Sequence, residues 1–274
     1  VFETIRFFGM VSPVDFLFGT YWGPDPMTPV DAVDPTRYGA IPLFWGTIFI
    51  GAIIAMIVAI PLGLMSAIYL TQYADPKVRA WVKPMLEILA GVPTVVYGYF
   101  AALTVAPAIR DAAVALGMSN ASTESALAAG IVMGVMIIPF VSSMADDSMA
   151  AVPSAMRDGS LAMGATKSET IRRVLFPAAL PGIVAGIMLA VSRAIGETMI
   201  VVMAASTAAN LTLNPLDRMT TVTVQIVKML TGEGDFDHPA TLSAFALGFV
   251  LFMVTLALNF IALRVVKRFR EAYE

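Results

Sequence analysis

The chain has 274 residues, of which 58% are hydrophobic and only 14% are charged, against about 45 to 50% and about 25% in a typical soluble domain. A mean hydropathy of +0.80 leaves too little polar surface for a soluble protein of this size, so lipid is the expected solvent. The absence of Cys, the single His (His238) and the net charge of -3 argue against disulfides, Cys or His metal sites and nucleic-acid binding.

The first 42 residues contain no apolar stretch of membrane-spanning length, because charged residues from Glu3 to Arg37 interrupt them. They also lack the apolar core of a secretory signal peptide. We therefore expect residues 1–42 to form a polar N-terminal segment outside the membrane.

Five apolar stretches of about 20 residues or more follow, which is the length that a helix needs to cross the hydrocarbon core. Helices are expected because only bonding within the helix satisfies the backbone in lipid. The predicted spans are residues 43–70, 85–109, 125–145, 178–205 and 241–263.

The basic residues of the connections are distributed unevenly, and positively charged loops are retained in the cytoplasm. Most of the 17 Lys and Arg lie on one side of the predicted bundle: Lys77, Arg79, Lys83, Arg157, Lys167, Arg172, Arg173, Arg264, Lys267, Arg268 and Arg270. That side, with the C-terminus, is predicted to be cytoplasmic. Because five is an odd number of spans, a cytoplasmic C-terminus places residues 1–42 in the periplasm. We therefore expect at least one further membrane helix before Val1 in the complete gene product.

Three smaller features complete the pattern outside the main spans. Apolar residues from Met219 to Met229 recur at helical spacing, which predicts a short outer helix that is either re-entrant or a cap without substrate contact. His238 follows in an outer loop and is expected to be solvated. At the cytoplasmic end of the second span, Lys83 and Glu87 are predicted to form an interfacial pair.

Residues 146–177 form the longest predicted cytoplasmic connection and encode two short helices. Pro153 can begin the first helix, and Gly164 can end it. Thr166 and Glu169 have the spacing of a capping box for the second helix, and Pro177 is predicted to stop it.

Two interpretations of this connection are open. Small and basic residues would let another protein approach the backbone closely and fix it by polar contacts: Gly159, Ser160, Ala162, Gly164, Lys167, Arg172 and Arg173. Alternatively, the connection is an interfacial hairpin that holds its basic residues at the lipid headgroups.

Arg193 and Glu197 lie inside the predicted span 178–205, and a spacing of four puts them on one helical face. An Arg at the centre of a membrane helix costs roughly 2.5 to 3.5 kcal/mol, so such residues face a protein interior or a water-filled cavity. The planar guanidinium suits an oxyanion. We expect a role in anion transport; the alternative is a pair that neutralises itself and only fixes helix packing.

Pro93 is predicted to kink or break the span 85–109, because it has no N–H to donate to the preceding turn. A break at membrane depth is tolerated where it lines protein or water, so Thr94 and Tyr97 are candidate donors to a transported anion. A kink that only improves packing is the alternative.

Three segments of the chain resemble one known family. The connection from Asp158 to Pro177 is similar to the EAA loop of ABC importer permeases, with Asp158-Gly-Ser in place of the usual Glu-Ala-Ala. Together with Ala90-Gly-Val-Pro-Thr-Val-Val-Tyr-Gly98 and Arg193-Ala-Ile-Gly-Glu-Thr-Met199, it resembles the permease subunits of the Pst phosphate importers. The Gly-Glu-Thr-Met-Ile-Val run is more similar to the PstC branch than to PstA, and the likeness extends from Tyr38 to the C-terminus.

The resemblance implies an all-α integral membrane protein of the bacterial inner membrane, with the five-helix core of a type I ABC importer permease, a cytoplasmic coupling helix and another membrane helix upstream. It implies a heterodimer with a PstA-type permease, two PstB-type ATPase subunits beneath it and a periplasmic phosphate-binding protein above it. The chain has no Gly-x-x-x-x-Gly-Lys-Ser/Thr run, so ATP and Mg would bind to the ATPase. The chain itself is expected to bind no cofactor or metal and to be no enzyme.

The same resemblance implies roles for individual residues. Phosphate would pass Arg193, Glu197 and Thr198, with Thr94 and Tyr97 as further donors. The coupling helix, which in this family enters a groove on the ATPase, would involve Asp158, Gly159, Ser160, Ala162, Gly164, Lys167 and Arg172. A permease for another oxyanion, such as phosphonate, molybdate or sulfate, and a passive anion channel are the alternatives.

Overall fold

The computed structural model describes residues 1–118, 122–232 and 235–271, with side chains described up to residue 264. Within these residues all regular elements are helices, and one isolated β-bridge joins Trp22 to Tyr38, so the all-α prediction is confirmed. The basic residues Lys267, Arg268 and Arg270, on which the predicted orientation partly depends, lie outside the described side chains.

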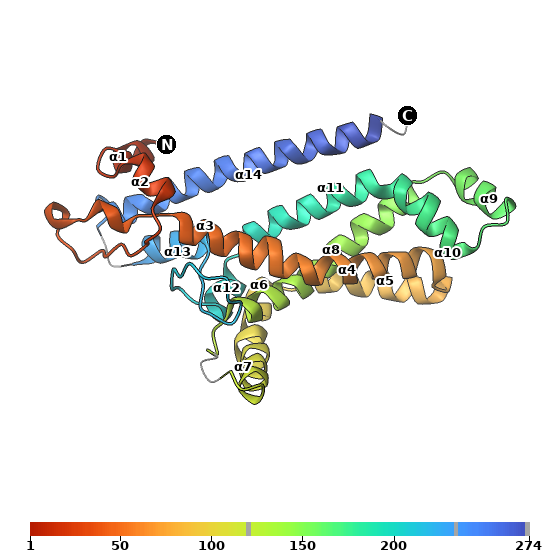
Figure 1. Ribbon diagram of the computed structural model, residues 1–274, viewed down its shortest axis with the longest axis horizontal. Helices are drawn as coiled ribbons and strands as arrows, with labels where there is room; N and C mark the ends of the chain where they lie inside the picture. Colours follow the sequence, from red (N-terminus) through yellow and green to blue (C-terminus); the bar gives the residue numbers. More distant parts are fainter. Residues whose placement is uncertain (119–121, 233–234, 272–274) are drawn as a thin grey trace. The chain divides into compact units, whose positions relative to one another are not determined.

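The chain forms two compact units. Unit 1 contains Val1–Ala55, Pro93–Met133 and Ala194–Leu256, and unit 2 contains Met56–Val92, Gly134–Arg193 and Ala257–Glu274. The helices of unit 1 are α1 (Phe2–Phe8), α2 (Pro13–Phe18), α3 (Ile41–Thr47), α6 (Thr94–Phe100), α7 (Ala106–Ala115), α12 (Met199–Ala204) and α13 (Val222–Thr231) (Figure 1). Those of unit 2 are α5 (Pro76–Ala90), α9 (Ser154–Ala162) and α10 (Lys167–Thr170). The chain continues from one unit to the other within α4 (Ala55–Ile68), α8 (Ala126–Ala150), α11 (Phe176–Ile195) and α14 (Pro239–Glu271).

Shorter helical turns lie between or next to these helices, and those at residues 48–54, 101–105 and 171–175 join neighbouring helices without interruption. The 3-10 turns are η1 (Val30–Ala32) and η2 (Pro35–Arg37), and the π-helical turns are η3 (Ile48–Ile54), η4 (Tyr69–Tyr73), η5 (Ala101–Val105) and η6 (Ile171–Leu175).

Four helices in the described part of the chain are long and apolar enough to cross a membrane: Ile41–Tyr73, Ala126–Ala150, Lys167–Ile195 and Pro239–Arg264. They correspond to four of the five predicted spans. In the remaining one, α5 ends at Ala90 and α6 begins at Thr94, because Pro93 is extended with ψ 136°. The predicted break at Pro93 is confirmed, and this pair of helices makes a fifth span only when the bent pair is counted as one.

The predicted stop at Pro177 is wrong. Helical structure continues from α10 through η6 into α11, so Pro177 lies in the first turn of α11. A π-helical turn shifts the bonding pattern by one residue and lets the helix pass a residue that has no N–H. The helix that corresponds to the fourth predicted span therefore begins at Lys167 and ends at Ile195, and the expected bounds of 178 and 205 do not hold.

Unit 1 contains an aromatic cluster contributed by the N-terminal segment. Phe7, Phe16, Trp22 and Tyr38 meet edge to face, with 5.3 Å between the ring centroids of Phe7 and Phe16. The cluster packs against buried apolar residues of α3, α13 and α14. Burying an aromatic side chain of this kind contributes about 1.5 to 3 kcal/mol to the free energy of folding. The aromatic cluster therefore holds residues 1–42 in place within unit 1.

His238 belongs to unit 1 and is buried, contrary to the prediction that it is solvated. Its exposed fraction is 5%. Nδ1 accepts the N–H of Ala240 at 3.1 Å, and Nε2 lies 2.8 Å from the carbonyl oxygen of Thr28. The acceptor role of Nδ1 requires a neutral ring with its hydrogen on Nε2, which donates to Thr28. The imidazole thus caps the start of α14 and ties it to the N-terminal segment.

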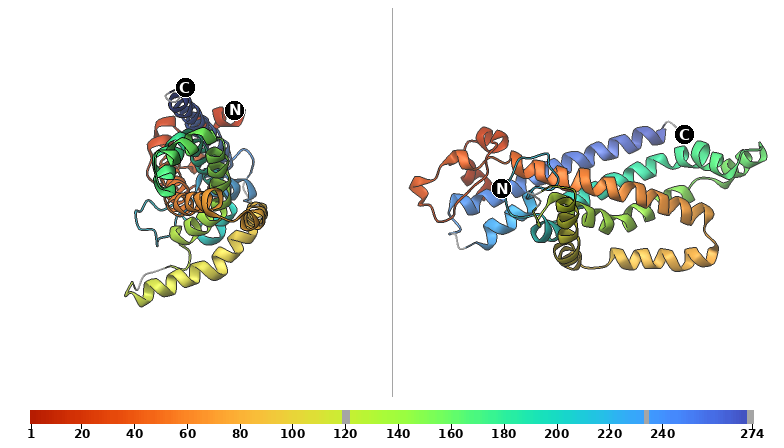
Figure 2. Two further views of the ribbon diagram at one scale, coloured as in Figure 1. Left: turned by 90° about the vertical axis from the view of Figure 1, so that its right-hand side faces the viewer. Right: turned by 60° about the horizontal axis from the view of Figure 1, so that its bottom comes forward.

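In unit 2, the helices α4, α8 and α11 run side by side (Figures 1 and 2). Their shared core consists of apolar residues, namely Ala67, Ala145, Met149, Ala179 and Ile183. Glycines bring the helices close together: a Cβ on Gly63 would lie 2.8 Å from the side chain of Val141. Such close approach at small residues is typical of membrane helices.

Candidate translocation and coupling sites

The helix predicted to carry both Arg193 and Glu197 is interrupted between them. α11 ends at Ile195, Gly196 forms a turn, and α12 begins after Thr198. The two charged residues therefore do not share one continuous helix, and the predicted common helical face is wrong.

The carboxylate of Glu197 pairs with the first N–H groups of α12. Its Oε1 accepts the N–H groups of Met199 at 3.0 Å and of Ile200 at 3.4 Å. The hydroxyl of Thr223, in the first turn of α13, donates to the carbonyl oxygen of Glu197 at 2.9 Å. A carboxylate at a helix N-terminus pairs N–H groups that have no partner inside the helix and interacts favourably with the helix dipole. These contacts stabilise the break, and they leave Glu197 buried.

Helix α6 packs against α12 within unit 1. A Cβ on Gly98 would lie 3.1 Å from the carbonyl oxygen of Met199, so only glycine allows this approach without a shift. Tyr97, next to it on α6, is buried, and Thr94 in the first turn is half-buried. The structure thus places the two predicted donors, Thr94 and Tyr97, on the helix that packs against α12, the helix that Glu197 caps.

Arg193 lies in the last turn of α11 and belongs to unit 2. Its side chain is exposed. Among the residues of unit 2 that the structure describes, no carboxylate forms an ion pair with it. A guanidinium without a paired carboxylate keeps its donors available for an anion.

The connection between α8 and α11 forms the predicted pair of short helices, α9 and α10 (Figure 1). Pro153 immediately precedes α9, and Gly164 turns the chain after it with φ +84°, a conformation that favours glycine. The predicted capping box is confirmed. The hydroxyl of Thr166 accepts the N–H of Glu169 at 3.3 Å, and the Glu169 carboxylate accepts the N–H of Thr166 at 3.0 Å.

The residues predicted to couple to an ATPase differ in how they face solvent. Most of them are exposed, namely Asp158, Gly159, Ala162, Gly164, Lys167 and Arg172. Ser160 is half-buried, with Oγ 3.0 Å from Oγ1 of Thr170, so it fixes α9 to α10. No atom lies within 4 Å of a Cβ built on Gly159, among the described residues, so another backbone can approach the helix there.

Asp146 forms a polar cluster that the sequence analysis did not identify. α8 extends to Ala150, so Asp146 lies within this helix, where it is 3% exposed. Its carboxylate accepts bonds from Thr71 Oγ1 at 2.6 Å and from Lys83 Nζ at 2.7 Å. Nη2 of Arg79 lies 3.0 Å from both carboxylate oxygens. Charge-assisted hydrogen bonds of this kind are about twice as strong as neutral ones.

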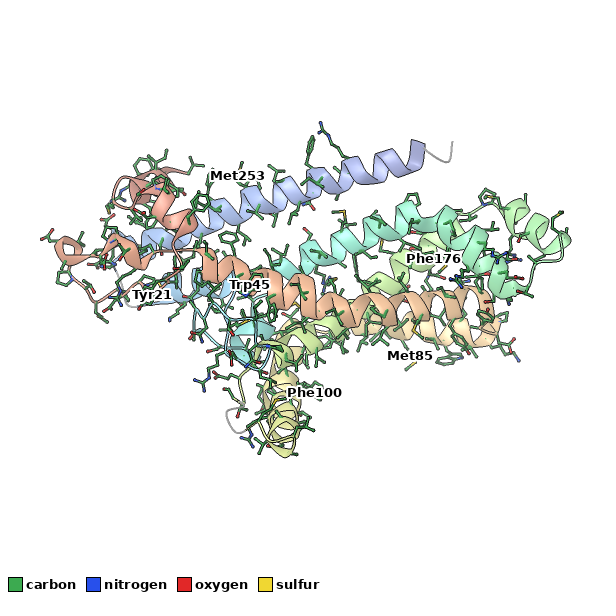
Figure 3. The ribbon with its side chains drawn as sticks, viewed as in Figure 1. Tyr21, Trp45, Met85, Phe100, Phe176 and Met253 are labelled. Atoms are coloured by element: carbon green, nitrogen blue, oxygen red, sulfur yellow. The ribbon has the colours of Figure 1, made fainter. Side chains whose placement is uncertain are left out.

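These bonds attach α5 to the rest of unit 2. No residue of α5 is buried, in a helix that the structure describes in full, and Met85 on it is 64% exposed (Figure 3). Lys83 forms ion pairs with Asp146 and Asp147, so its predicted pairing with Glu87 is wrong. The same region of unit 2 contains a hollow of about 210 Å³ lined by residues of α5 and α8.

Comparison with known proteins identifies the family of this chain. The sequence pattern of the family described as "Binding-protein-dependent transport system inner membrane component" matches residues 59–271. The chain belongs to this family. The permease is 33% identical over 245 residues to the probable ABC transporter permease protein YqgH of Bacillus subtilis, covering 89% of this chain and 75% of that protein.

Two further relatives are named as phosphate transport permeases. The permease is 30% identical over 253 residues to the probable phosphate transport system permease protein PstC of Methanocaldococcus jannaschii, covering 88% of this chain and 79% of that one. It is 30% identical over 263 residues to the phosphate transport system permease protein PstC of Xylella fastidiosa, covering 91% of this chain and 77% of that one.

Solved structures share the fold of the permease. A chain of the MetNI methionine ABC transporter matches with a TM-score of 0.63 and 19% identity, covering 86% of this chain and 99% of that one. A chain of a bacterial alginate ABC transporter matches with a TM-score of 0.62 and 12% identity, covering 97% of this chain and 86% of that one. The predicted ABC importer permease fold is confirmed, and the protein is a multi-pass inner-membrane protein.

Proposed function

We propose that this permease is the membrane subunit of an ATP-driven importer that carries inorganic phosphate across the bacterial inner membrane. The two relatives named PstC support phosphate as the substrate. Within this chain, the observation that carries the proposal is Arg193, an exposed guanidinium in the last turn of an otherwise apolar helix. A planar and permanently charged fork binds two oxygens of a phosphate at once.

Four further residues are proposed to complete the pathway. Thr94, Tyr97 and Thr198 carry hydroxyl groups that can donate to phosphate oxygens. Glu197 is proposed to take up a proton, or to turn away from the N–H groups that it caps, as the anion passes. Each of these residues lies in or directly before a short helix of unit 1, α6 or α12.

The proposed importer needs partners for energy and for substrate delivery. Because the chain contains no Gly-x-x-x-x-Gly-Lys-Ser/Thr run, ATP and Mg are bound by an ATPase partner. We infer a heterodimer with a PstA-type permease, two PstB-type ATPase subunits and a periplasmic phosphate-binding protein. α9, α10 and the C-terminus face the cytoplasm in this proposal, and the ATPase contacts α9 and the turn at Gly164.

Transport is proposed to proceed by alternating access. ATP binding closes the ATPase dimer, and the attached α9 and α10 move with it. The spans then open the pathway toward the periplasm, where the binding protein releases phosphate. Hydrolysis returns the spans to the arrangement that is open to the cytoplasm.

Uptake of labelled phosphate by cells that depend on this transporter tests the role of Arg193. Arg193→Gln is expected to abolish uptake while the complex still assembles, and Arg193→Lys to retain a small part, because a point charge replaces a fork. Lys228→Gln, which removes one positive charge from the exposed side of α13, serves as the control and is expected to transport normally. Normal uptake by an assembled Arg193→Gln complex would refute the assigned role.

A further inference from the structure

A second basic site is formed within unit 2. It is a hollow of about 270 Å³ within unit 2, bounded by η4, α9, α10 and η6, and we call it the α9–α10 pocket. Binding sites for drug-sized ligands have about 300 to 1,000 Å³, so this pocket is of a size for a small group. Arg157 of α9 and Lys167 of α10 both line it.

The two basic side chains of the α9–α10 pocket are poorly neutralised. Nζ of Lys167 lies 4.9 Å from the centre of the Tyr73 ring, and no described carboxylate forms an ion pair with it. Arg157 has only a long contact of 3.7 Å with Asp158, and both side chains are more than half exposed. Such an exposed pair contributes little, so both cations remain available to a ligand.

Glu169, the acidic residue nearest to Lys167 along the chain, is already engaged. The carboxylate of Glu169 accepts bonds from the N–H and the hydroxyl of Thr166 at 3.0 and 2.8 Å, as part of the capping box. It therefore holds the start of α10 in place and forms no ion pair with Arg157 or Lys167, both of which the structure describes.

The other lining residues are the polar Gln72 and Thr170 and the apolar Leu161, Ile171 and Leu175. Thr170 and Gln72 contribute a hydroxyl and an amide, and the hydroxyl of Thr170 also meets Ser160 at 3.0 Å. Thr170, Ile171 and Leu175 are buried, whereas Leu161 is 42% exposed. Donors without acidic groups among the lining residues favour an anionic ligand group.

We propose that the α9–α10 pocket binds a phosphate group through Arg157 and Lys167. Arg157 supplies a planar fork and Lys167 a point charge, the two side chains that proteins use most for phosphate. The phosphate group can come from free inorganic phosphate or from an anionic lipid headgroup. The effect on transport rests on the proposed function, because the pocket is built from the same helices that would contact the ATPase. A bound phosphate there would join α9 to α10.

Binding of inorganic phosphate to the assembled transporter, measured by calorimetry in a zwitterionic detergent without nucleotide, tests the proposal. All variants carry Arg193→Gln, so that the proposed pathway residue does not contribute. Arg157→Gln with Lys167→Gln is expected to weaken binding more than about tenfold, because two charge-assisted bonds are lost. The control, Lys77→Gln with Arg264→Gln, also removes one Lys and one Arg charge, but outside the pocket, and it is expected to bind as the parent does.

A second arm distinguishes the two sources of the phosphate group. The complex is placed in bilayers of phosphatidylcholine with or without phosphatidylglycerol, and the retained lipid is counted by native mass spectrometry. Retention of phosphatidylglycerol that depends on Arg157 and Lys167, without binding of free phosphate, supports the proposal with lipid as the source. If neither ligand depends on these two residues more than on the control pair, the proposal is overturned.

Two further variants keep the test valid if the double variant does not assemble. Arg157→Gln alone leaves Lys167 in place, and it is expected to weaken binding by a smaller factor. Arg157→Lys with Lys167→Arg keeps both charges and is expected to retain most of the binding. If Arg157→Gln leaves both the binding of inorganic phosphate and the retention of phosphatidylglycerol unchanged, the proposal is contradicted. Because these measurements use no ATP and detect no transport, they fail or succeed independently of the uptake test with Arg193→Gln.

Discussion

Glu197 shapes the backbone of the proposed pathway as well as carrying a charge there. Its carboxylate pairs the first N–H groups of α12, and its own carbonyl oxygen accepts the hydroxyl of Thr223. The capping contact needs only an acceptor oxygen, whereas uptake of a proton needs an ionisable group. The two contributions can therefore be separated by substitution.

Glu197→Gln is expected to fold normally, because its amide oxygen still accepts the N–H of Met199. Glu197→Ala is expected to lose about 1 kcal/mol of unfolding free energy, the usual cost of a lost helix cap. Both variants are expected to lower phosphate uptake about tenfold or more, which corresponds to about 1.4 kcal/mol in the barrier. Thermal unfolding and uptake assays measure the two effects. Full uptake by Glu197→Gln would show that this residue only caps α12.

Asp146 is expected to stabilise unit 2 more than its neighbour Asp147 does. Asp146→Asn removes the charge that Arg79 and Lys83 share, at an estimated cost of about 1 to 3 kcal/mol of unfolding free energy, since the acceptor is buried. Asp147 has a side chain 65% exposed and a single contact of 3.4 Å, so Asp147→Asn is expected to cost below about 0.5 kcal/mol. Thermal unfolding of the purified complex compares them, and equal effects would contradict this ranking.

Contacts of single residues could be predicted only where both partners lie close together in the sequence. Thr166 and Glu169 are three residues apart, so their capping box follows from local spacing. Asp146 pairs with Lys83 and Arg79, which lie 63 and 67 residues away in the sequence. No local sequence pattern indicates a contact between residues so far apart. The burial of His238 could not be predicted for the same reason, because its partner Thr28 is 210 residues away in the sequence.

At the scale of helices, the glycine contacts of unit 2 determine how closely the helices approach. Gly63→Val would place a branched side chain against Val141 of α8, where even a Cβ lies 2.8 Å away. Overpacking of this kind typically costs about 1 to 3 kcal/mol, so the unfolding temperature is expected to fall.

Gly159→Ala is the matched control for this substitution. Among the described residues nothing lies within 4 Å of its added Cβ, and Ala favours a helix over Gly by up to about 1 kcal/mol. Its unfolding temperature is expected to stay the same or to rise. A larger loss of stability in Gly159→Ala than in Gly63→Val would contradict the assigned packing.

The existence of the long helices could be predicted from the sequence, but their ends could not. Hydropathy identifies stretches that must be helical in lipid, and the break at Pro93 follows from its missing N–H. The same rule fails at Pro177, where η6 lets the helix continue. It also gives no warning of the break after Ile195, which Glu197 stabilises by accepting N–H groups of the next helix. Proline rules and hydropathy do not describe such local compensation.

For the molecule as a whole, the proposed orientation in the membrane can be tested because the chain has no Cys. Met163, in the turn after α9, is 88% exposed, and Phe236, before α14, is 80% exposed. A single Cys at either position gives a site for a thiol reagent that does not cross membranes. Met163→Cys is expected to react only from the cytoplasmic side, and Phe236→Cys only from the periplasmic side. The opposite pattern would reverse the proposed topology.

The measurement that tests the central claim most directly is ATP-dependent uptake of labelled phosphate into proteoliposomes. The vesicles contain this permease with its permease and ATPase partners, and the phosphate-binding protein is supplied on the periplasmic side. Uptake is expected only with ATP, and excess sulfate or molybdate is expected to leave it unchanged. Phosphate movement without ATP would identify a passive channel, and uptake that sulfate or molybdate suppresses would contradict phosphate as the preferred substrate.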